Sequence, residues 1–222
     1  MDYKSITGKI TAALEKIRKP ECDGNFKRNA LYGGIFLLSG TLLGVFSKWL
    51  DATVIDDGVW WQRLLGATDL GNVFSEFPVW LFAALAISVY AKTPLNAALR
   101  VFLFFAGMCA AYHAFSVIIA GFNPMSYMMI WYGFTILSPL LAVLCWYAKG
   151  KSVPSLVLCT LILWVMTSCC FSTGLLYFGF ISATDTLIFI AAALVLYVSP
   201  KNTAISLALA FVLAIVFRLP LV

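Results

Sequence analysis

Charged residues are scarce in this chain. Its 222 residues include 15 lysines and arginines and 10 aspartates and glutamates, so only 11% are charged, whereas soluble domains carry roughly 25%. Apolar residues make up 62% of the sequence, and its mean hydropathy is +0.95. A soluble fold of this size has too little core for so many apolar side chains. We therefore expect most of the chain to lie in a lipid bilayer.

Residues that commonly bind metals or carry catalysis are also few. The sequence has one histidine, His113, and its six cysteines lack the spacing of a metal site. It contains no G-x-S-x-G nucleophile elbow, no H-E-x-x-H zinc helix, no P-loop and no dinucleotide-binding glycine motif. We therefore expect no cofactor and no metal. Any transport would draw its energy from a gradient or from a partner chain.

The net charge of +5 does not indicate a nucleic-acid-binding protein. The basic residues stand at the ends of apolar runs and do not form a patch interleaved with aromatic residues. Anchoring of membrane helices on the cytoplasmic side accounts for this distribution. We therefore expect the lipid bilayer, and not nucleic acid, to be the main partner.

Long apolar runs fill most of the sequence, and the first, Asn29–Leu50, orients the chain. Eighteen residues from Ala30 to Ser47 carry no charge, and at ~1.5 Å per residue they nearly cross a hydrocarbon layer of ~30 Å. Six further runs follow: Pro78–Ala91, Ala97–Ile119, Ser126–Tyr147, Val153–Cys170, Thr184–Val198 and Thr203–Phe217. The pattern predicts an all-α polytopic integral membrane protein with seven transmembrane helices. Six spans are the alternative, if a short run is re-entrant.

The lysines and arginines predict the orientation. If the spans alternate from a cytoplasmic N-terminus, twelve basic residues fall on the inner side: Lys4, Lys9, Lys16, Arg18, Lys19, Lys27, Arg28, Lys92, Arg100, Lys149, Lys151 and Lys201. Three fall on the outer side: Lys48, Arg63 and Arg218. This bias follows the positive-inside rule and predicts an N-in, C-out topology. Together with the lack of a signal-peptide pattern, it fits a multi-pass protein of a bacterial inner membrane.

Two regions fall outside the apolar runs. Residues 1–28 form a cytoplasmic segment in which the apolar residues of 3–19 recur at helical spacing. This predicts an amphipathic helix in the headgroup layer, and its packing on the cytoplasmic loops is the alternative. The second region is a polar outer loop at 51–76 within the transmembrane region 29–222. There, Val59–Leu65 is typical of a short amphipathic turn at the membrane interface.

Three further features predict how the spans pack. A stripe of small residues lies on one face of the first span: Gly33, Gly40, Gly44 and Ser47. It indicates close packing within the bundle or a homo-oligomer contact. Pro139 follows Ser138 inside the fourth span, where it frees a backbone carbonyl that needs a new partner. The apolar outer linker Cys169–Asp185 would be unusual in water, so we expect it to re-enter the bilayer, cover the bundle or bind a partner protein.

Polar residues at membrane depth gather toward the outer side and define the candidate site. It comprises Lys48, Asp51, His113, Trp131, Tyr132 and Asp185. Carboxylates and aromatic rings together suit a small cationic or zwitterionic solute. In the alternative interpretation, Lys48 extends to the interface, Asp185 caps a helix and His113 hydrogen-bonds inside the bundle.

Three hypotheses for function follow. The preferred one is binding or transport of a small solute or ion across the cytoplasmic membrane, alone, as a homo-oligomer or as the membrane subunit of a larger transporter. The second is a membrane-embedded enzyme acting on lipid or polyprenyl substrates at the outer leaflet, with the adjacent acids Asp56 and Asp57 as acid and base. The third is a non-catalytic scaffold that binds a partner membrane protein. The missing catalytic motifs make an enzyme the less favoured interpretation.

Overall fold

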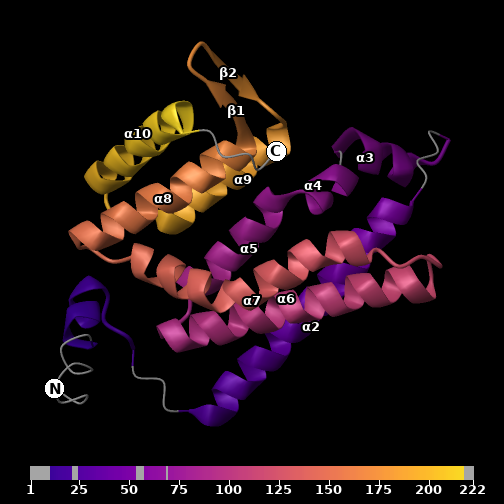
Figure 1. Ribbon diagram of the computed structural model, residues 1–222, viewed down its shortest axis with the longest axis horizontal. Coiled ribbons are helices and arrows are strands. Elements are labelled where there is room, and N and C mark those ends of the chain that lie inside the picture. Colours follow the sequence, from indigo (N-terminus) through magenta and orange to yellow (C-terminus); the bar gives the residue numbers. More distant parts are fainter. Residues whose placement is uncertain (1–10, 22–24, 54–57, 69, 218–222) are drawn as a thin grey trace.

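The computed structural model describes residues 11–21, 25–53, 58–68 and 70–217. These residues form helices and one two-stranded antiparallel sheet. The helices are α2 (Phe26–Ala52), α3 (Trp60–Thr68), α4 (Leu70–Ser75), α5 (Phe77–Val89), α6 (Pro94–Ile118), α7 (Met125–Ala148), α8 (Val153–Cys170), α9 (Ala183–Leu196) and α10 (Pro200–Val216), and the strands are β1 (Phe171–Gly174) and β2 (Tyr177–Phe180) (Figure 1). Residues 11–17 are also helical.

Every predicted apolar run coincides with a helix to within a few residues at each end. Four of these helices, α2, α6, α7 and α8, are long enough and apolar enough to cross a bilayer. The other apolar helices, α5, α9 and α10, have 13, 14 and 17 residues. At ~1.5 Å per residue they are shorter than a hydrocarbon layer of ~30 Å. The chain is thus a helical membrane protein.

The helices after the inner turns begin with a hydroxyl residue followed closely by proline. Thr93 precedes α6 and accepts a hydrogen bond of 3.1 Å from the backbone N–H of Asn96. Ser199 precedes α10 and accepts one of 3.3 Å from the N–H of Asn202. A proline in the first helical turn fixes φ and removes an N–H that would lack a helical partner. These signals start α6 and α10 three residues before the predicted apolar runs, which began at Ala97 and Thr203.

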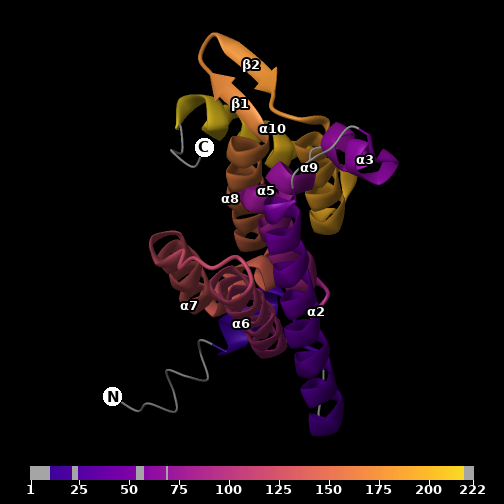
Figure 2. The same ribbon diagram turned by 90° about the vertical axis from the view of Figure 1, so that its right-hand side faces the viewer.

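The helices form two groups that meet at α5 (Figures 1 and 2). The first group contains α2, α6 and α7, and the second contains α8, α9 and α10. Trp80 of α5 belongs to the buried cluster of the first group, whereas Leu85 and Val89 of the same helix belong to that of the second. A short apolar helix therefore contributes to both buried cores.

Glycine allows α2 and α6 to approach closely. A Cβ atom at Gly40 would lie 1.9 Å from the carbonyl oxygen of Phe104, and one at Gly44 would lie 2.4 Å from that of Met108. From the other helix, a Cβ at Gly107 would lie 2.4 Å from the carbonyl oxygen of Leu37. The small-residue stripe predicted on the first span therefore packs inside the bundle.

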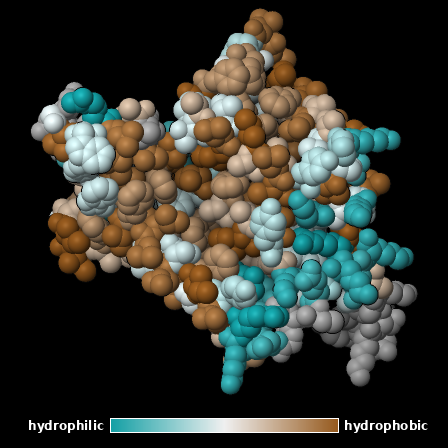
Figure 3. Space-filling model, turned by 180° about the vertical axis from the view of Figure 1, so that it is seen from behind, coloured by the Kyte–Doolittle hydropathy of each residue, from teal (hydrophilic) through white to brown (hydrophobic). Residues whose placement is uncertain are grey.

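The opposite face of α2 is exposed and apolar. Leu31, Leu38 and Leu42 have exposed fractions of 64%, 59% and 61%. Such a row would aggregate in water but is the normal surface of a helix in lipid. Figure 3 shows hydrophobic side chains over most of one face of the molecule, with hydrophilic ones gathered at one edge.

The described residues of the polar loop predicted at 51–76 fold against the C-terminal end of α2. Trp61 of α3 stacks on Trp49 with ring centroids 6.1 Å apart. Phe74 of α4 meets Phe46 edge to face at 5.4 Å, and its carbonyl oxygen accepts a hydrogen bond of 3.3 Å from Ser47. The predicted turn at Val59–Leu65 lies mostly within α3, where Trp61 takes part in packing and Trp60 is 76% exposed.

The apolar linker after α8 is a β-hairpin, which the prediction of an all-α chain omitted. Phe171 pairs with Phe180, and Gly174 pairs with Tyr177. Phe171 is buried and contacts the rings of Phe189 in α9 and Phe211 in α10, at 5.0 and 6.0 Å between centroids. Phe171 extends the core of the second group, whereas the tip of the hairpin projects beyond the helix ends (Figures 1 and 2), with Leu175 and Leu176 82% and 98% exposed. The tip therefore does not cover the bundle, and re-entry into the bilayer and binding of a partner protein stay predictions.

Pro139 lies inside α7, as predicted, and the carbonyl that it frees has a partner. Because proline lacks an N–H, the carbonyl oxygen of Thr135 loses its helical donor. The hydroxyl of Ser138 donates a hydrogen bond of 2.9 Å to that oxygen. The Ser-Pro pair therefore satisfies the backbone locally within the membrane.

Residues 11–21 pack on the turns that precede α6 and follow α7. The backbone N–H of Glu21 donates a hydrogen bond of 3.0 Å to the carbonyl oxygen of Lys92. Leu14 and Ile17 pack against the buried cluster of the first group, and a Cβ at Gly150 would lie 2.3 Å from the carbonyl oxygen of Ile17. For the described part of the predicted amphipathic helix, these contacts match packing on the turns that connect the apolar helices. Its residues 3–10 lie outside the described residues.

Candidate functional site

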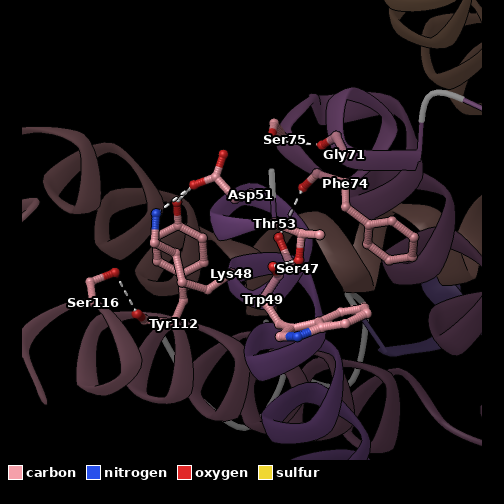
Figure 4. A network of polar contacts seen from close by, with 10 residues as sticks. All are labelled: Ser47, Lys48, Trp49, Asp51, Thr53, Gly71, Phe74, Ser75, Tyr112 and Ser116. Carbon is pink, nitrogen blue, oxygen red and sulfur yellow. Dashed lines mark hydrogen bonds and ion pairs between the residues drawn. The ribbon is translucent and has the colours of Figure 1, made fainter. Parts of the chain in front are cut away.

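The side chain of Lys48 lies in a cage at the C-terminal end of α2. Its Nζ lies 2.5 Å from Oδ2 of Asp51, and the Lys48 side chain is only 7% exposed. The same Nζ lies 5.2 Å from the ring centroid of Tyr112 and 4.9 Å from that of Phe122. The hydroxyl of Tyr112 donates a hydrogen bond of 3.3 Å to Oδ2 of Asp51 (Figure 4). The ammonium therefore has one carboxylate and two aromatic rings around it.

Local structure explains why these groups converge. Lys48 and Asp51 are three residues apart, so they share one face of α2. Tyr112 comes from α6, which the glycine contacts hold against α2. After α6 the chain reverses at Gly121, whose φ of 73° favours glycine. This turn returns Phe122 toward Lys48, and its N–H donates a hydrogen bond of 3.1 Å to the carbonyl oxygen of Ser116.

His113 belongs to a second polar group. Its Nε2 lies 3.1 Å from Oδ1 of Asn123, and its Nδ1 is hydrogen-bonded to the hydroxyl of Tyr132. Since an amide oxygen only accepts, Nε2 donates to Asn123 in this arrangement. The histidine therefore joins α6 to α7 and to the turn between them.

Trp131 lies below the cage in an aromatic cluster. It is buried, stacks on Phe77 with centroids 5.1 Å apart, and meets Trp80 edge to face at 6.2 Å. A pocket of about 10 Å³ separates Trp131 from Ser47 and Tyr112, a volume that suits roughly one water molecule. Trp131 therefore lies beneath the polar residues Lys48, Asp51 and Tyr112, on the far side of this small pocket.

Asp185 has a different environment. It is 2% exposed and lies in the first turn of α9. Its backbone N–H donates a hydrogen bond of 3.0 Å to Oγ of Ser182, whose hydroxyl donates one of 2.6 Å to Oδ2 of Asp185. This reciprocal pair, together with the helix dipole, accounts for a carboxylate at that position.

The structure thus groups the predicted site residues in pairs. Lys48 meets Asp51, His113 meets Tyr132, and Trp131 and Asp185 have separate partners. Sequence reasoning did not include Phe122, which completes the cage, although the Gly-Phe dipeptide at the end of an apolar run is the signal that marks it. Asp56 and Asp57, the acids of the enzyme hypothesis, lie outside the described residues.

No known protein family, characterised protein or solved structure matches this chain. Among the described residues, no group of three or more histidine, cysteine, aspartate or glutamate side chains could hold a metal ion. The arguments about function therefore depend on the contacts described above.

Proposed function

We propose that the chain crosses a bacterial inner membrane seven times, N-in and C-out, and binds a small cationic or zwitterionic solute at its outer end. It would act as a transporter, alone or as the membrane subunit of a larger one. The short helices α5, α9 and α10 would cross a locally thinned bilayer or extend through their polar flanks.

Contacts between helix ends support this topology. Near the start of α6, Asn96 donates a hydrogen bond of 3.3 Å to Asn29 near the start of α2. Lys149, which follows α7, donates to the carbonyl oxygen of Val195 and, at 2.8 Å, to that of Tyr197, at the end of α9. The starts of α2 and α6 therefore lie together, and so do the ends of α7 and α9. Seven alternating spans would place all four of these helix ends on the inner side, where most lysines and arginines lie.

Tags on both ends of the chain test the topology. We expect an N-terminal tag to be accessible only from the cytoplasm and a C-terminal tag only from outside, in intact cells and in inverted vesicles. Accessibility of both tags from one side would leave an even number of crossings and would contradict seven spans.

The proposed function depends on the position of the Lys48 ammonium. The carboxylate of Asp51 and the rings of Tyr112 and Phe122 are the groups that recognise an ammonium solute, and here they surround an ammonium of the chain itself. We propose that Lys48 occupies the site in the resting state. A cationic solute would take the same place when the lysine side chain swings outward.

The neighbouring polar group extends the proposed site. His113 follows Tyr112 on α6, and its links to Tyr132 and Asn123 provide a group that can take up a proton near the cage. We therefore propose a proton gradient as the energy source. Trp131 would form the floor of the site. For Asp185 we propose a capping role in α9, with an indirect effect on the solute.

Thermal stabilisation by solutes tests the site. Purified protein in nanodiscs is heated with a panel that includes choline, glycine betaine, arginine and putrescine. We expect at least one solute to raise the melting temperature, Lys48→Met to strengthen its binding because the internal competitor is gone, and Asp51→Asn to abolish it. Lys201→Met is the matched control on the inner side. A shift that Asp51→Asn leaves unchanged, or no shift across the panel, contradicts the proposal.

A further inference from the structure

An apolar cavity of about 260 Å³ lies between α5, α6, α7 and α8. Its walls include Leu81, Ala84 and Leu85 of α5 and Val101 of α6. Two serines also line it, but the hydroxyl of Ser88 donates to the carbonyl oxygen of Ala84 at 2.6 Å, and Ser138 donates to Thr135. The cavity, whose lining also includes the thiol of Cys145, therefore presents an almost wholly apolar wall to a ligand.

The cavity is long and narrow. Along α5 its walls run from Phe77 to Ser88, which is about 16 Å at ~1.5 Å per residue. Along α7 they run from Trp131 to Cys145, which is about 21 Å by the same rise. An apolar cavity of ~150 Å³ in a soluble protein stays dry and binds benzene. A larger, elongated one suits a flexible hydrocarbon chain.

The cavity opens toward the lipid. Leu141 and Leu144 of α7 and Leu161 of α8 line it and are also 42%, 40% and 41% exposed. Both helices are among the four that can cross a bilayer by length and composition. The mouth of the cavity therefore faces the acyl region of the membrane, and what enters most readily is an acyl chain.

Two tryptophans close the end of the cavity that faces the polar cage. Trp80 and Trp131 line both this cavity and the small pocket next to Ser47 and Tyr112. Trp80 is fixed by a hydrogen bond of 2.9 Å from its indole N–H to the carbonyl oxygen of Phe74. The rings thus separate an apolar compartment from the polar outer end.

We infer that this cavity binds one acyl chain of a membrane phospholipid, which enters between α7 and α8 and lies along α5. Apart from Trp131, which lies between the two, the cavity is lined by residues other than those of the proposed solute site, so either proposal can fail without the other. The bound acyl chain would fill the space between the two groups of helices. If this space were empty, the side chains that line it would lose dispersion contacts.

A photoreactive lipid tests this inference. Protein is reconstituted in nanodiscs with a phosphatidylcholine that carries a diazirine in the middle of one chain, and the labelled residues are mapped by mass spectrometry. We expect labelling to concentrate on the cavity walls of α5, α7 and α8. Labelling spread evenly over exposed residues such as Leu38 and Leu42 of α2 would overturn the inference.

Variants that fill or close the cavity provide the controls. Ala84→Phe places a ring inside it and should reduce wall labelling about tenfold, whereas Ala110→Phe, on an exposed part of α6, should not change it. If Ala84→Phe does not fold, Leu141→Phe narrows the mouth and should give the same loss. Labelling that persists in the folded variant contradicts the inference. Asp51→Asn, which disables the proposed solute site, should leave labelling unchanged.

Discussion

Arg18 donates a hydrogen bond of 2.7 Å from Nη1 to the carbonyl oxygen of Trp146, 128 residues further along the chain. Its Nη2 donates one of 3.0 Å to the carbonyl oxygen of Val89, and its guanidinium lies 4.2 Å from the centre of the Trp146 ring. One side chain therefore joins the C-terminal ends of α5 and α7, where helix dipoles favour a cation. Burial lowers the pKa of Arg18, with Glu21 acting in the opposite direction, but an arginine stays charged.

Arg18→Met should therefore lower the free energy of unfolding by about 1.5–3 kcal/mol, the range for hydrogen bonds to charged groups. Arg18→Lys should give an intermediate loss, because an ammonium does not reproduce the fork of the guanidinium. Lys16→Met, on the exposed side of the same segment, is the control. The measurement is unfolding by sodium dodecyl sulfate in mixed micelles. Equal stability of the Arg18→Met and Lys16→Met variants would show that the segment does not fasten these helices.

The glycine contacts between α2 and α6 give a second prediction. Gly40→Ala should lower the free energy of unfolding by about 2–3 kcal/mol, because the new Cβ would meet backbone and the helices must separate. Gly34→Ala has nothing within 4 Å of its Cβ. It should stabilise the helix by about 0.5–1 kcal/mol through backbone entropy. If Gly40→Ala and Gly34→Ala changed the free energy of unfolding in the same direction, the observed packing of α2 against α6 would be contradicted.

The pair formed by Lys48 and Asp51 predicts unequal effects of removing each partner. Asp51→Asn leaves a buried ammonium without a counter-charge and should cost about 2–4 kcal/mol. Lys48→Met leaves a carboxylate that is 39% exposed, so water can replace the ammonium and the cost should be about 1 kcal/mol or less.

A double-mutant cycle checks this argument. The variant with both substitutions should be more stable than Asp51→Asn alone, since no unpaired charge is left. Unfolding in mixed micelles supplies the free energies. Additive losses would show that the two side chains do not stabilise each other.

The Ser138-Pro139 pair gives a fourth prediction. Ser138→Ala should lower the free energy of unfolding by about 1–2 kcal/mol, because the carbonyl oxygen of Thr135 then has no donor. In a Pro139→Ala background the backbone N–H of residue 139 is restored, so Ser138→Ala should have little effect. The same loss in both backgrounds would mean that the hydroxyl contributes in another way.

The positions of the apolar helices could be predicted because hydropathy and helix-start signals are local. Thr93 and Ser199 mark helix starts through bonds to residues three positions later, and each precedes a proline. The hairpin at 171–180 could not be predicted in this way. Its strands depend on the contacts of Phe171 with Phe189 and Phe211, which are far apart in the sequence.

The candidate site was only partly predictable for the same reason. Lys48 and Asp51 share a helix face, so their contact follows from their spacing. The position of Phe122 over the ammonium depends on the turn at Gly121 and on the tight packing of α2 against α6. The helix cap at Asp185, which the sequence offered as an alternative, is local, because Ser182 and Asp185 form a Ser-x-x-Asp helix start.

The placement of α5 between the two helix groups has a consequence for how the molecule loses its structure. Trp80 belongs to one buried cluster while Leu85 and Val89 belong to the other, so neither cluster is complete without this helix. Melting of either half would expose one flank of α5 and weaken the remaining half. The two halves should therefore denature in a single concerted transition, with no half-folded species between them.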